Sequence, residues 1–212
     1  QNKIFTILHV LFLCVAFSVI IFTDKLRLHL FLNDFVASPF NDFFKYLTYV
    51  GDGIFVILVA LVMLFFNAQK SLTILLCYGA STGFTQGIKY YFFGNADRPS
   101  LIFETLHIPL KIADGVDLNL HHSFPSGHAT AAFSLFFCLS FFSKNNLMGI
   151  IYFISALLVA FSRVYLSQHF FEDITVGSLI GVSFSFLVCF ILYETKIVQR
   201  MNKLQKPIYK FF

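Results

Sequence analysis

The sequence SRVYLSQHFFED (residues 162–173) separates two long apolar segments near the end of the chain. It holds Arg163, His169 and Asp173, whereas the segments on either side, Leu147 to Arg163 and Ile174 to Tyr193, contain almost no charge. Ionisable residues beside segments long enough to cross a bilayer are energetically costly and therefore mark functional positions. This polar junction indicates both a turn between two membrane helices and a candidate site.

The composition is that of a membrane protein. Of the 212 residues, 58% are hydrophobic and 12% are charged, and the mean hydropathy is +0.78. With 31 Phe against 15 basic and 11 acidic side chains, the chain cannot cover a soluble core with polar surface. The lipid bilayer is therefore the expected solvent. The basic residues show no aromatic-basic groove pattern, which argues against nucleic acid as a partner.

Six apolar segments can cross about 30 Å of hydrocarbon as helices. They are Ile4 to Phe22, Gly51 to Phe66, Ser71 to Phe93, Ser126 to Phe142, Leu147 to Arg163 and Ile174 to Tyr193. Helices are predicted because an open sheet cannot satisfy its edges in lipid. With no internal repeat or linker, the sequence predicts one all-α polytopic domain over residues 1–212, a bundle of six transmembrane helices.

Charge sets the expected orientation. An even number of spans puts both termini on one side of the membrane. Basic residues are enriched on the cytoplasmic side. The side that contains both termini is therefore expected to be cytoplasmic, since it carries Lys70, Lys144 and the tail residues Lys196, Arg200, Lys203, Lys206 and Lys210. The longer connections, Thr23 to Val50 and Gly94 to Pro125, are then outside. The first of them alternates Phe with polar residues, which fits a helix or hairpin in the head-group plane or an ordinary solvated connector.

Three cations fall at the outer ends of the predicted spans, namely Lys89, Arg98 and Arg163. Brought together, they would hold a phosphate dianion, and each guanidinium would match its oxygens with two hydrogen bonds. Ser126 and Gly127 begin the fourth span, where free backbone N–H groups and the helix dipole also favour an anion. These five residues are the predicted phosphate-binding set.

Two histidines provide the expected chemistry. His169 and Asp173 are four residues apart and so share one helix face, where the carboxylate can hold one ring nitrogen as N–H and leave the other as a lone pair. Neighbouring cations disfavour protonation of His169, so it can attack phosphorus and form a phosphohistidine. His128 would act as general acid for the leaving group and then as base for water.

The motifs that carry these residues resemble the signatures of the type 2 phosphatidic acid phosphatase superfamily. Ser162-Arg163, five residues, His169, three residues and Asp173 resemble the third signature, and Pro125-Ser126-Gly127-His128 resembles the second. The first signature of the family is Lys, six residues and Arg-Pro. Here eight residues separate Lys89 from Arg98-Pro99, which is a departure from the pattern.

The resemblance implies a metal-independent lipid phosphatase without a cofactor. Its substrate would be a phosphomonoester or pyrophosphate on phosphatidylglycerol phosphate, phosphatidic acid, undecaprenyl diphosphate or lipid A, and the sequence does not choose among these. The implied catalytic residues are His169, His128 and Asp173, and the implied phosphate ligands are Lys89, Arg98, Ser126, Gly127 and Arg163. The size of the chain resembles bacterial members, which implies an inner-membrane protein with its site facing outside. The oligomeric state is left open.

Other interpretations remain at this stage. A six-span carrier of phosphorylated solutes would also need buried cations, although carriers place them between inverted repeats. A zinc site could be built from Asp117, His121, His122 and His128. A third alternative is a vanadium haloperoxidase, a class related to this superfamily. Those enzymes are soluble, so the apolar composition of this chain argues against it. Isolated side chains are expected to have no role of their own: His29 as a loop residue that is either satisfied by neighbours or solvated, and the four cysteines, Cys14, Cys77, Cys138 and Cys189, as small packing residues.

Overall fold

The computed structural model describes residues 3–194, and within this range every regular element is helical. The elements are α1 (Ile4–Phe22), α2 (Lys25–Asn33), α3 (Ser38–Leu47), η1 (Thr48–Gly51), α4 (Gly53–Phe66), α5 (Ala68–Tyr91), α6 (Pro99–Thr105), α7 (Gly127–Phe142), α8 (Asn146–Tyr165) and α9 (Phe171–Glu194). The all-α prediction is confirmed for this part of the chain. The basic tail used to orient the protein lies outside the described residues.

Polar capping residues divide the apolar sequence into separate helices. The side chains of Asp52, Asn67, Ser126 and Asn145 each accept a backbone N–H from the first turn of the helix that follows. An N-cap of this kind satisfies a donor that has no partner inside the helix. The short turns between α4 and α5 and between α7 and α8 therefore follow directly from Asn67 and Asn145.

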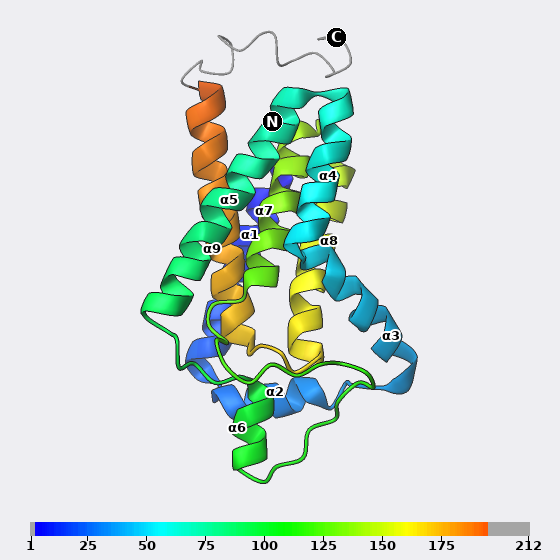
Figure 1. Cartoon of the computed structure of the whole chain (residues 1–212), viewed down its shortest axis with the longest axis vertical. Coiled ribbons are helices and arrows are strands. Elements are labelled where there is room, and N and C mark those ends of the chain that lie inside the picture. Colours follow the sequence, from blue (N-terminus) through cyan, green and yellow to red (C-terminus); the bar gives the residue numbers. More distant parts are fainter. Residues whose placement is uncertain (1–2, 195–212) are drawn as a thin grey trace.

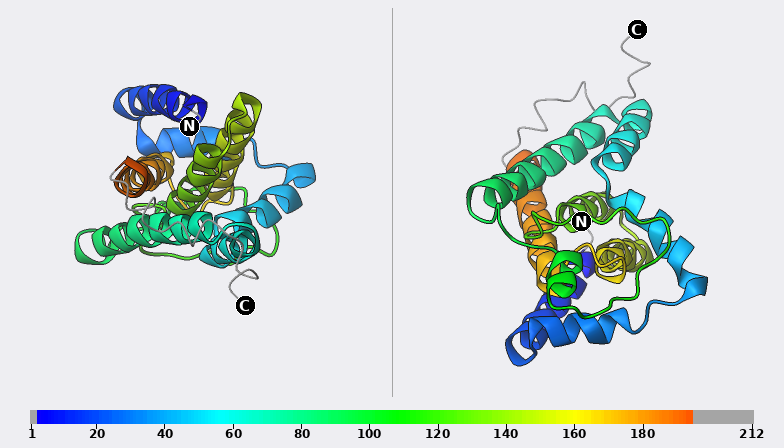
Figure 2. Two further views of the ribbon diagram at one scale, coloured as in Figure 1. Left: turned by 90° about the horizontal axis from the view of Figure 1, so that it is seen from above. Right: turned by 60° about the horizontal axis from the view of Figure 1, so that its bottom comes forward.

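Helix α7 lies at the centre of the bundle, in contact with α5, α8 and α9, as the view from above shows (Figure 2). Around it, α5 and α9 run along one side and α4 and α8 along the other (Figure 1). The connections α2 and α6 lie across the lower end of the bundle in this view, and the long segment between α5 and α7 passes beneath it (Figure 1). This lower end is where α5 and α8 finish and where α7 and α9 begin.

The six predicted spans correspond to α1, α4, α5, α7, α8 and α9, with boundaries that differ by at most a few residues. Among the described residues, α1, α8 and α9 are long and apolar enough to cross a membrane alone. A fourth span is obtained if Pro39–Gly51 and Gly53–Phe66, which meet at an angle of 61°, are counted as one. Helix α7 has only 16 residues, so the count of six stays a proposal.

The outward faces of these helices are apolar. On α1, the side chains of Val10, Leu11 and Val15 are exposed, and α4 exposes Leu58 and Leu61 in the same way. A soluble protein does not present such continuous apolar surface. The exposed faces are therefore the surfaces that contact lipid, whereas the aromatic cluster formed by Phe5, Phe133, Phe137 and Phe153 fills the space between helices.

Two glycines allow α9 to approach α7 closely. A Cβ atom at Gly177 would lie 2.6 Å from the carbonyl oxygen of Ser126, and one at Gly181 would lie 2.5 Å from the carbonyl oxygen of Thr130. Small residues spaced four apart are a common way for membrane helices to pack backbone against backbone. This contact fixes the start of α9 beside the start of α7, because the Ser126 N–H donates to the Asp173 carbonyl over 3.0 Å.

Substitution of Gly177 should expose this constraint. Gly177→Ala is expected to lower the free energy of unfolding by about 1–3 kcal/mol, because the added methyl must displace backbone of α7. Thermal unfolding of the two proteins in detergent measures this difference in stability. Gly79→Ala is the matched control, since a Cβ atom there meets no heavy atom within 4 Å in the middle of α5. Equal stability of the two variants would contradict the close α7–α9 contact.

Candidate active site

The predicted phosphate ligands meet at one cavity at the lower end of the bundle. This cavity has a volume of about 500 Å³. The predicted site residues in its wall are Lys89, Arg98, Gly127, His128, Arg163 and His169, which come from five separate segments of the chain. Ser126 and Asp173 do not line it; they lie directly behind Gly127 and His169. The sequence prediction that these motifs lie together is thus supported by the geometry.

The longer spacing of the first motif is accommodated where α5 ends. Lys89 lies in the last turn of α5, and the chain then leaves the helix at Phe92 before Arg98 caps α6. The extra residues lie in this loop, whose position is fixed by two backbone hydrogen bonds, from Arg98 N–H to Leu120 and from Ser123 N–H to Ala96. Lys89 therefore reaches the same cavity as Arg98 despite the departure from the family pattern.

Gln168, which sequence reasoning missed, orients both guanidinium groups. Its Oε1 accepts from Arg98 Nη1 at 2.9 Å and lies 3.5 Å from Arg163 Nη2. Its Nε2 donates to the Asp117 carbonyl, which fixes the orientation of the amide. Thr48 holds the other end of the Arg163 guanidinium through a 2.8 Å hydrogen bond. In the sequence, the only indication of a role for Gln168 is its position directly before His169.

His169 and Asp173 form the expected pair. The Nδ1 atom of His169 lies 3.3 Å from Oδ2 of Asp173, and both side chains are almost fully buried. The same carboxylate oxygen accepts from the Phe170 N–H at 2.9 Å and from the hydroxyl of Ser123. With Nδ1 held by the carboxylate, Nε2 is the ring nitrogen available to a reacting group.

The protonation state of His169 follows from its surroundings. Burial lowers the pKa of His169 well below its ordinary value of 6.5, and the positive charges of Arg98 and Arg163 lower it further. Desolvation and like charge both disfavour the imidazolium form. His169 is therefore a neutral imidazole at physiological pH, as a nucleophile must be.

The turn between α8 and α9 carries His169 in a strained backbone. The carbonyl oxygen of Arg163 accepts the N–H groups of both Gln168 and His169, and Ser167 adopts a positive φ of 50°. A non-glycine residue in this conformation costs roughly 1–3 kcal/mol, so contacts must support it. Two side chains of α2, His29 and Asn33, lie within 3.4 Å of the Ser167 hydroxyl and provide that support.

Of the two expectations for His29, the structure favours a satisfied side chain over a solvated one. Only 1% of His29 is exposed, and its ring packs against Phe103 and Phe170. Burial lowers the pKa of His29 to about 4, so it remains neutral. Sequence reasoning missed it because α2 has mixed polarity, and its position over the α8–α9 turn depends on tertiary packing.

The second motif forms the N-terminus of α7. Ser126 caps the helix through the Ala129 N–H, and its own N–H is engaged by the carbonyl of Asp173, so it is not free for a ligand. Gly127 and His128 occupy the first turn, where backbone N–H groups have no acceptor within the helix. At this terminus, the backbone N–H groups that point out of the helix and could serve a ligand are therefore those of Gly127 and His128.

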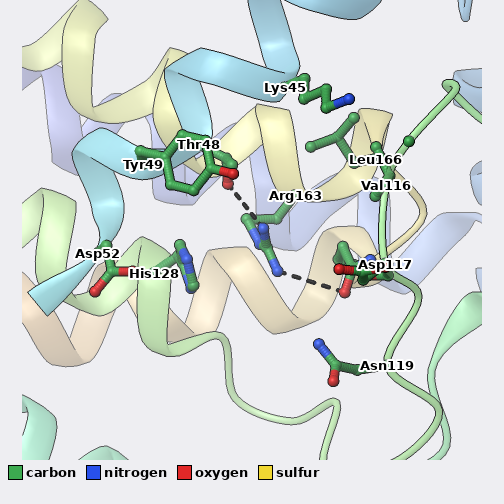
Figure 3. A pocket seen from close by; sticks show the side chains of 12 residues that line it. Lys45, Thr48, Tyr49, Asp52, Val116, Asp117, Asn119, His128, Arg163 and Leu166 are labelled. Atoms are coloured by element: carbon green, nitrogen blue, oxygen red, sulfur yellow. Dashed lines mark hydrogen bonds between the residues drawn. The ribbon is translucent and has the colours of Figure 1, made fainter.

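Two further cavities meet the first at His128. A polar cavity of about 210 Å³ lies on the far side of Arg163 and is drawn in Figure 3. A third cavity of about 390 Å³ lies between α4, α5 and α7. Within residues 3–194, His128 is the one side chain that lines all three. His128 therefore lies where the phosphate cavity adjoins both of its neighbours.

The structure does not favour the zinc alternative. Asp117, His121, His122 and His128 do not form a ligand cluster, and Nδ1 of His121 is instead 2.8 Å from Asp97. Among the described residues, the group able to hold a metal ion consists of three buried thiols on α5, α7 and α9: Cys77, Cys138 and Cys189. Burial of these three thiols agrees with the expectation that they are small packing residues, whereas Cys14 is exposed. Their convergence was not predicted, because they lie far apart in the sequence.

Comparison with known proteins agrees with these features. Residues 70–197 match the family model described as the PAP2 superfamily. The chain is 27% identical over 166 residues to a dihydrosphingosine 1-phosphate phosphatase of Schizosaccharomyces pombe, covering 72% of this chain and 38% of that protein. This chain therefore spans well under half the length of that relative.

Two solved structures have the same fold. Aquifex aeolicus LpxE matches with a TM-score of 0.69 and 25% identity, over 79% of this chain and 95% of that one. A transmembrane PAP2 type phosphatidylglycerolphosphate phosphatase from Bacillus subtilis matches with a TM-score of 0.59 and 25% identity, over 86% and 92%. Together with the apolar helices and the family match over more than half of the sequence, these similarities show that the chain is an integral membrane protein that belongs to the PAP2 superfamily.

Proposed function

We propose that this protein hydrolyses a phosphate ester carried by a membrane lipid, through a phosphohistidine on His169. The observation that carries the proposal is the placement of a buried, neutral imidazole in a cavity wall that also holds Lys89, Arg98 and Arg163. Buried cations without a carboxylate for each of them favour a multiply charged anion. A phosphate group satisfies that requirement and presents phosphorus to Nε2 of His169.

The first chemical step transfers the phosphoryl group. The lone pair of Nε2 attacks phosphorus as the bond to the ester oxygen breaks. His128, which is an imidazolium when the phosphate dianion is bound beside it, donates its proton to that oxygen and becomes neutral, so that the lipid alcohol departs uncharged. Asp173 keeps the proton on Nδ1 and balances the charge that develops on the ring. The cations and the N–H groups of Gly127 and His128 stabilise the equatorial oxygens.

The second step returns the enzyme to its starting state. His128, now neutral, takes a proton from water, and the resulting hydroxide attacks phosphorus and breaks the bond to Nε2. Inorganic phosphate leaves, and His169 is again a neutral imidazole. Each proton and electron pair is accounted for by these two histidines and water, so the proposed mechanism needs no metal.

The lipid is proposed to extend from the cavity into the bilayer. The phosphatases in the comparisons act, according to their names, on a dihydrosphingosine phosphate or on phosphatidylglycerolphosphate, which are both lipid phosphate monoesters. A carrier is not favoured, because the cations lie at one end of the bundle rather than at its middle. One chain end of a phosphate monoester placed at His128 can enter the cavity between α4, α5 and α7.

The site is proposed to face the outer side of the membrane, with both termini in the cytoplasm. Lys70 and Lys144 lie at the opposite end of the bundle, in the turns before α5 and α8. Basic residues prefer cytoplasmic turns, which supports this orientation. The bacterial sources of the two solved relatives support the proposal of a bacterial inner membrane.

Replacement of the nucleophile tests the mechanism directly. His169→Ala is expected to abolish phosphate release from a lipid phosphate in detergent, whereas the wild type remains active with a metal chelator present. Phosphate release is measured colorimetrically, and unchanged thermal unfolding controls for folding. Retained activity of His169→Ala would exclude the phosphohistidine, and loss of wild-type activity with chelator would exclude the metal-free mechanism.

The pH dependence should report on the cations around His169. Because they lower its pKa, the imidazole stays neutral through pH 6.5 and the wild type should lose kcat/KM only at more acidic pH. Arg98→Gln removes one of these charges and should raise the pKa, so that the acid limb moves to higher pH while the maximum falls. Both profiles are measured on one substrate, whose own ionisation is then common to both. An unmoved acid limb would contradict the assignment.

Lys89 tests the first motif. Lys89→Ala is expected to raise KM and lower kcat, with a combined loss in kcat/KM of about 100-fold, because one charge on the phosphate is then unbalanced in the transition state. Lys70→Ala, at the opposite end of α5, is the control and should leave both constants unchanged. Wild-type kinetics of Lys89→Ala would show that the longer spacing removes this residue from the site.

A further inference from the structure

Three cysteine side chains meet inside the helix bundle. Cys77 lies on α5, Cys138 on α7 and Cys189 on α9, and each of them is at most 1% exposed. Their Sγ atoms all lie within 4.8 Å of one another, and those of Cys77 and Cys189 are 3.9 Å apart. A single buried cysteine is a small packing residue. Three sulfur atoms gathered from three helices form a set of donors.

This thiol cluster is separate from the phosphate cavity. Cys77 and Lys89 are twelve residues apart on α5, which corresponds to about 18 Å along the helix. Within the described part of the chain, the walls of the phosphate cavity and of its two neighbours contain none of the three thiols. Phosphoryl transfer therefore does not account for the cluster.

The spacing of the sulfur atoms fits an ion in three-coordinate geometry. At the centre of a triangle with sides of 3.9–4.8 Å, an ion would lie about 2.3–2.8 Å from each sulfur. A bond between a first-row metal ion and a thiolate sulfur is about 2.3 Å long. The three side chains therefore need to move by at most about half an ångström to bind one ion.

The donor set favours a soft ion with a low coordination number. Sulfur donors select soft ions such as Cu(I) over ions that prefer oxygen. Among residues 3–194, no histidine, carboxylate or further cysteine joins the three thiols. Structural zinc is almost always held by four protein ligands, so this cluster is one ligand short for zinc.

The surroundings of the cluster favour a monovalent ion. All three cysteines belong to the main hydrophobic core, together with Ile74 and Leu135. A net charge in such a core is costly. With Cu(I), one thiolate cancels the charge of the ion, and the other two cysteines can bind as neutral thiols. A divalent ion would require a second thiolate and the loss of a second proton.

We propose that Cys77, Cys138 and Cys189 form a binding site for one Cu(I) ion held by three sulfur atoms. The ion takes the place of one thiol proton, which is released to water, and neither copper nor sulfur changes its oxidation state. The bound ion links α5, α7 and α9, which pack against one another. The site goes beyond the proposed phosphatase function and does not depend on it.

Buried polar groups connect the thiols with the end of the bundle opposite the phosphate cavity. Thr73 lies one turn before Cys77 on α5, and Tyr193 lies one turn after Cys189 on α9. The hydroxyl groups of Thr73 and Tyr193 are 3.3 Å apart, and that of Thr73 also donates to the carbonyl of Gln69 in the first turn of α5. These oxygen atoms provide a route by which the ion enters and the proton leaves.

Competition with a chromophoric Cu(I) chelator tests the site. The purified full chain is mixed in detergent with the Cu(I) complex of bicinchoninate, under ascorbate and without oxygen. The wild type is expected to withdraw one Cu(I) ion per chain, and X-ray absorption at the copper edge should show three sulfur neighbours. Failure to withdraw copper, or coordination by nitrogen or oxygen, would overturn the proposal.

Single cysteine variants assign the ligands. Cys138→Ala should bind Cu(I) about 100-fold more weakly than the wild type, because one of the three sulfur donors is lost. Cys14→Ala is the matched control and should bind like the wild type, since Cys14 is an exposed residue of α1 outside the cluster. Unchanged affinity of Cys138→Ala, or an equal loss in both variants, would overturn the assignment.

Thermal unfolding provides an independent measurement and shows whether each variant folds. An ion that binds only the folded chain raises Tm. Cu(I) should therefore raise the Tm of the wild type and of Cys14→Ala, but not that of Cys138→Ala. If Cys138→Ala does not fold, Cys189→Ala takes its place in both measurements. A rise in Tm that persists without one of these thiols would contradict the three-sulfur site.

Discussion

The backbone contact between α7 and α9 is the constraint on which the rest of the structure depends. Gly177 lets α9 lie against the carbonyl of Ser126, and the Ser126 N–H in turn donates to the carbonyl of Asp173. The second and third motifs are therefore joined through main-chain atoms rather than through the reactive side chains. His128 and His169 thus keep their relative position without a hydrogen bond between them. In the proposed mechanism this leaves Nε2 of His169 free to attack phosphorus and His128 free to transfer a proton.

A cavity lined by three cations, with one deeply buried carboxylate behind its wall, cannot be an electrostatically neutral core. Desolvation and mutual repulsion both act against it, so the fold must supply oriented acceptors. Gln168 provides a single amide oxygen near both guanidinium groups, and Thr48 provides a hydroxyl. These neutral acceptors fix the geometry without cancelling the charge. The positive potential that remains is available to a phosphate dianion and keeps His169 neutral in its absence.

The sequence was sufficient for features that depend on local pattern and on motif spacing. It predicted the helices at the six apolar segments and the meeting of Lys89, Arg98, His128 and His169 at one cavity. It did not predict α6, the burial of His29 or the convergence of Cys77 with two other thiols, because each depends on which helix faces become neighbours. The prediction of a free N–H at Ser126 was wrong for the same reason, because that N–H donates to the carbonyl of Asp173. The role of Gln168 was not predicted, because its side chain has no titratable group and the search of the sequence was for titratable residues.

The segment before the family match also contributes to the surroundings of the site. The residues proposed for phosphoryl transfer lie within the family match at residues 70–197, whereas Thr48 and Gly51 of η1 precede it. Thr48 accepts a hydrogen bond from Arg163 over 2.8 Å, and Gly51 lies directly against His128, where a Cβ atom would be 3.2 Å from the Cβ of the histidine. Because η1 contacts both residues, it holds the guanidinium and the imidazole in fixed positions relative to each other, although it lies outside the motifs that carry them.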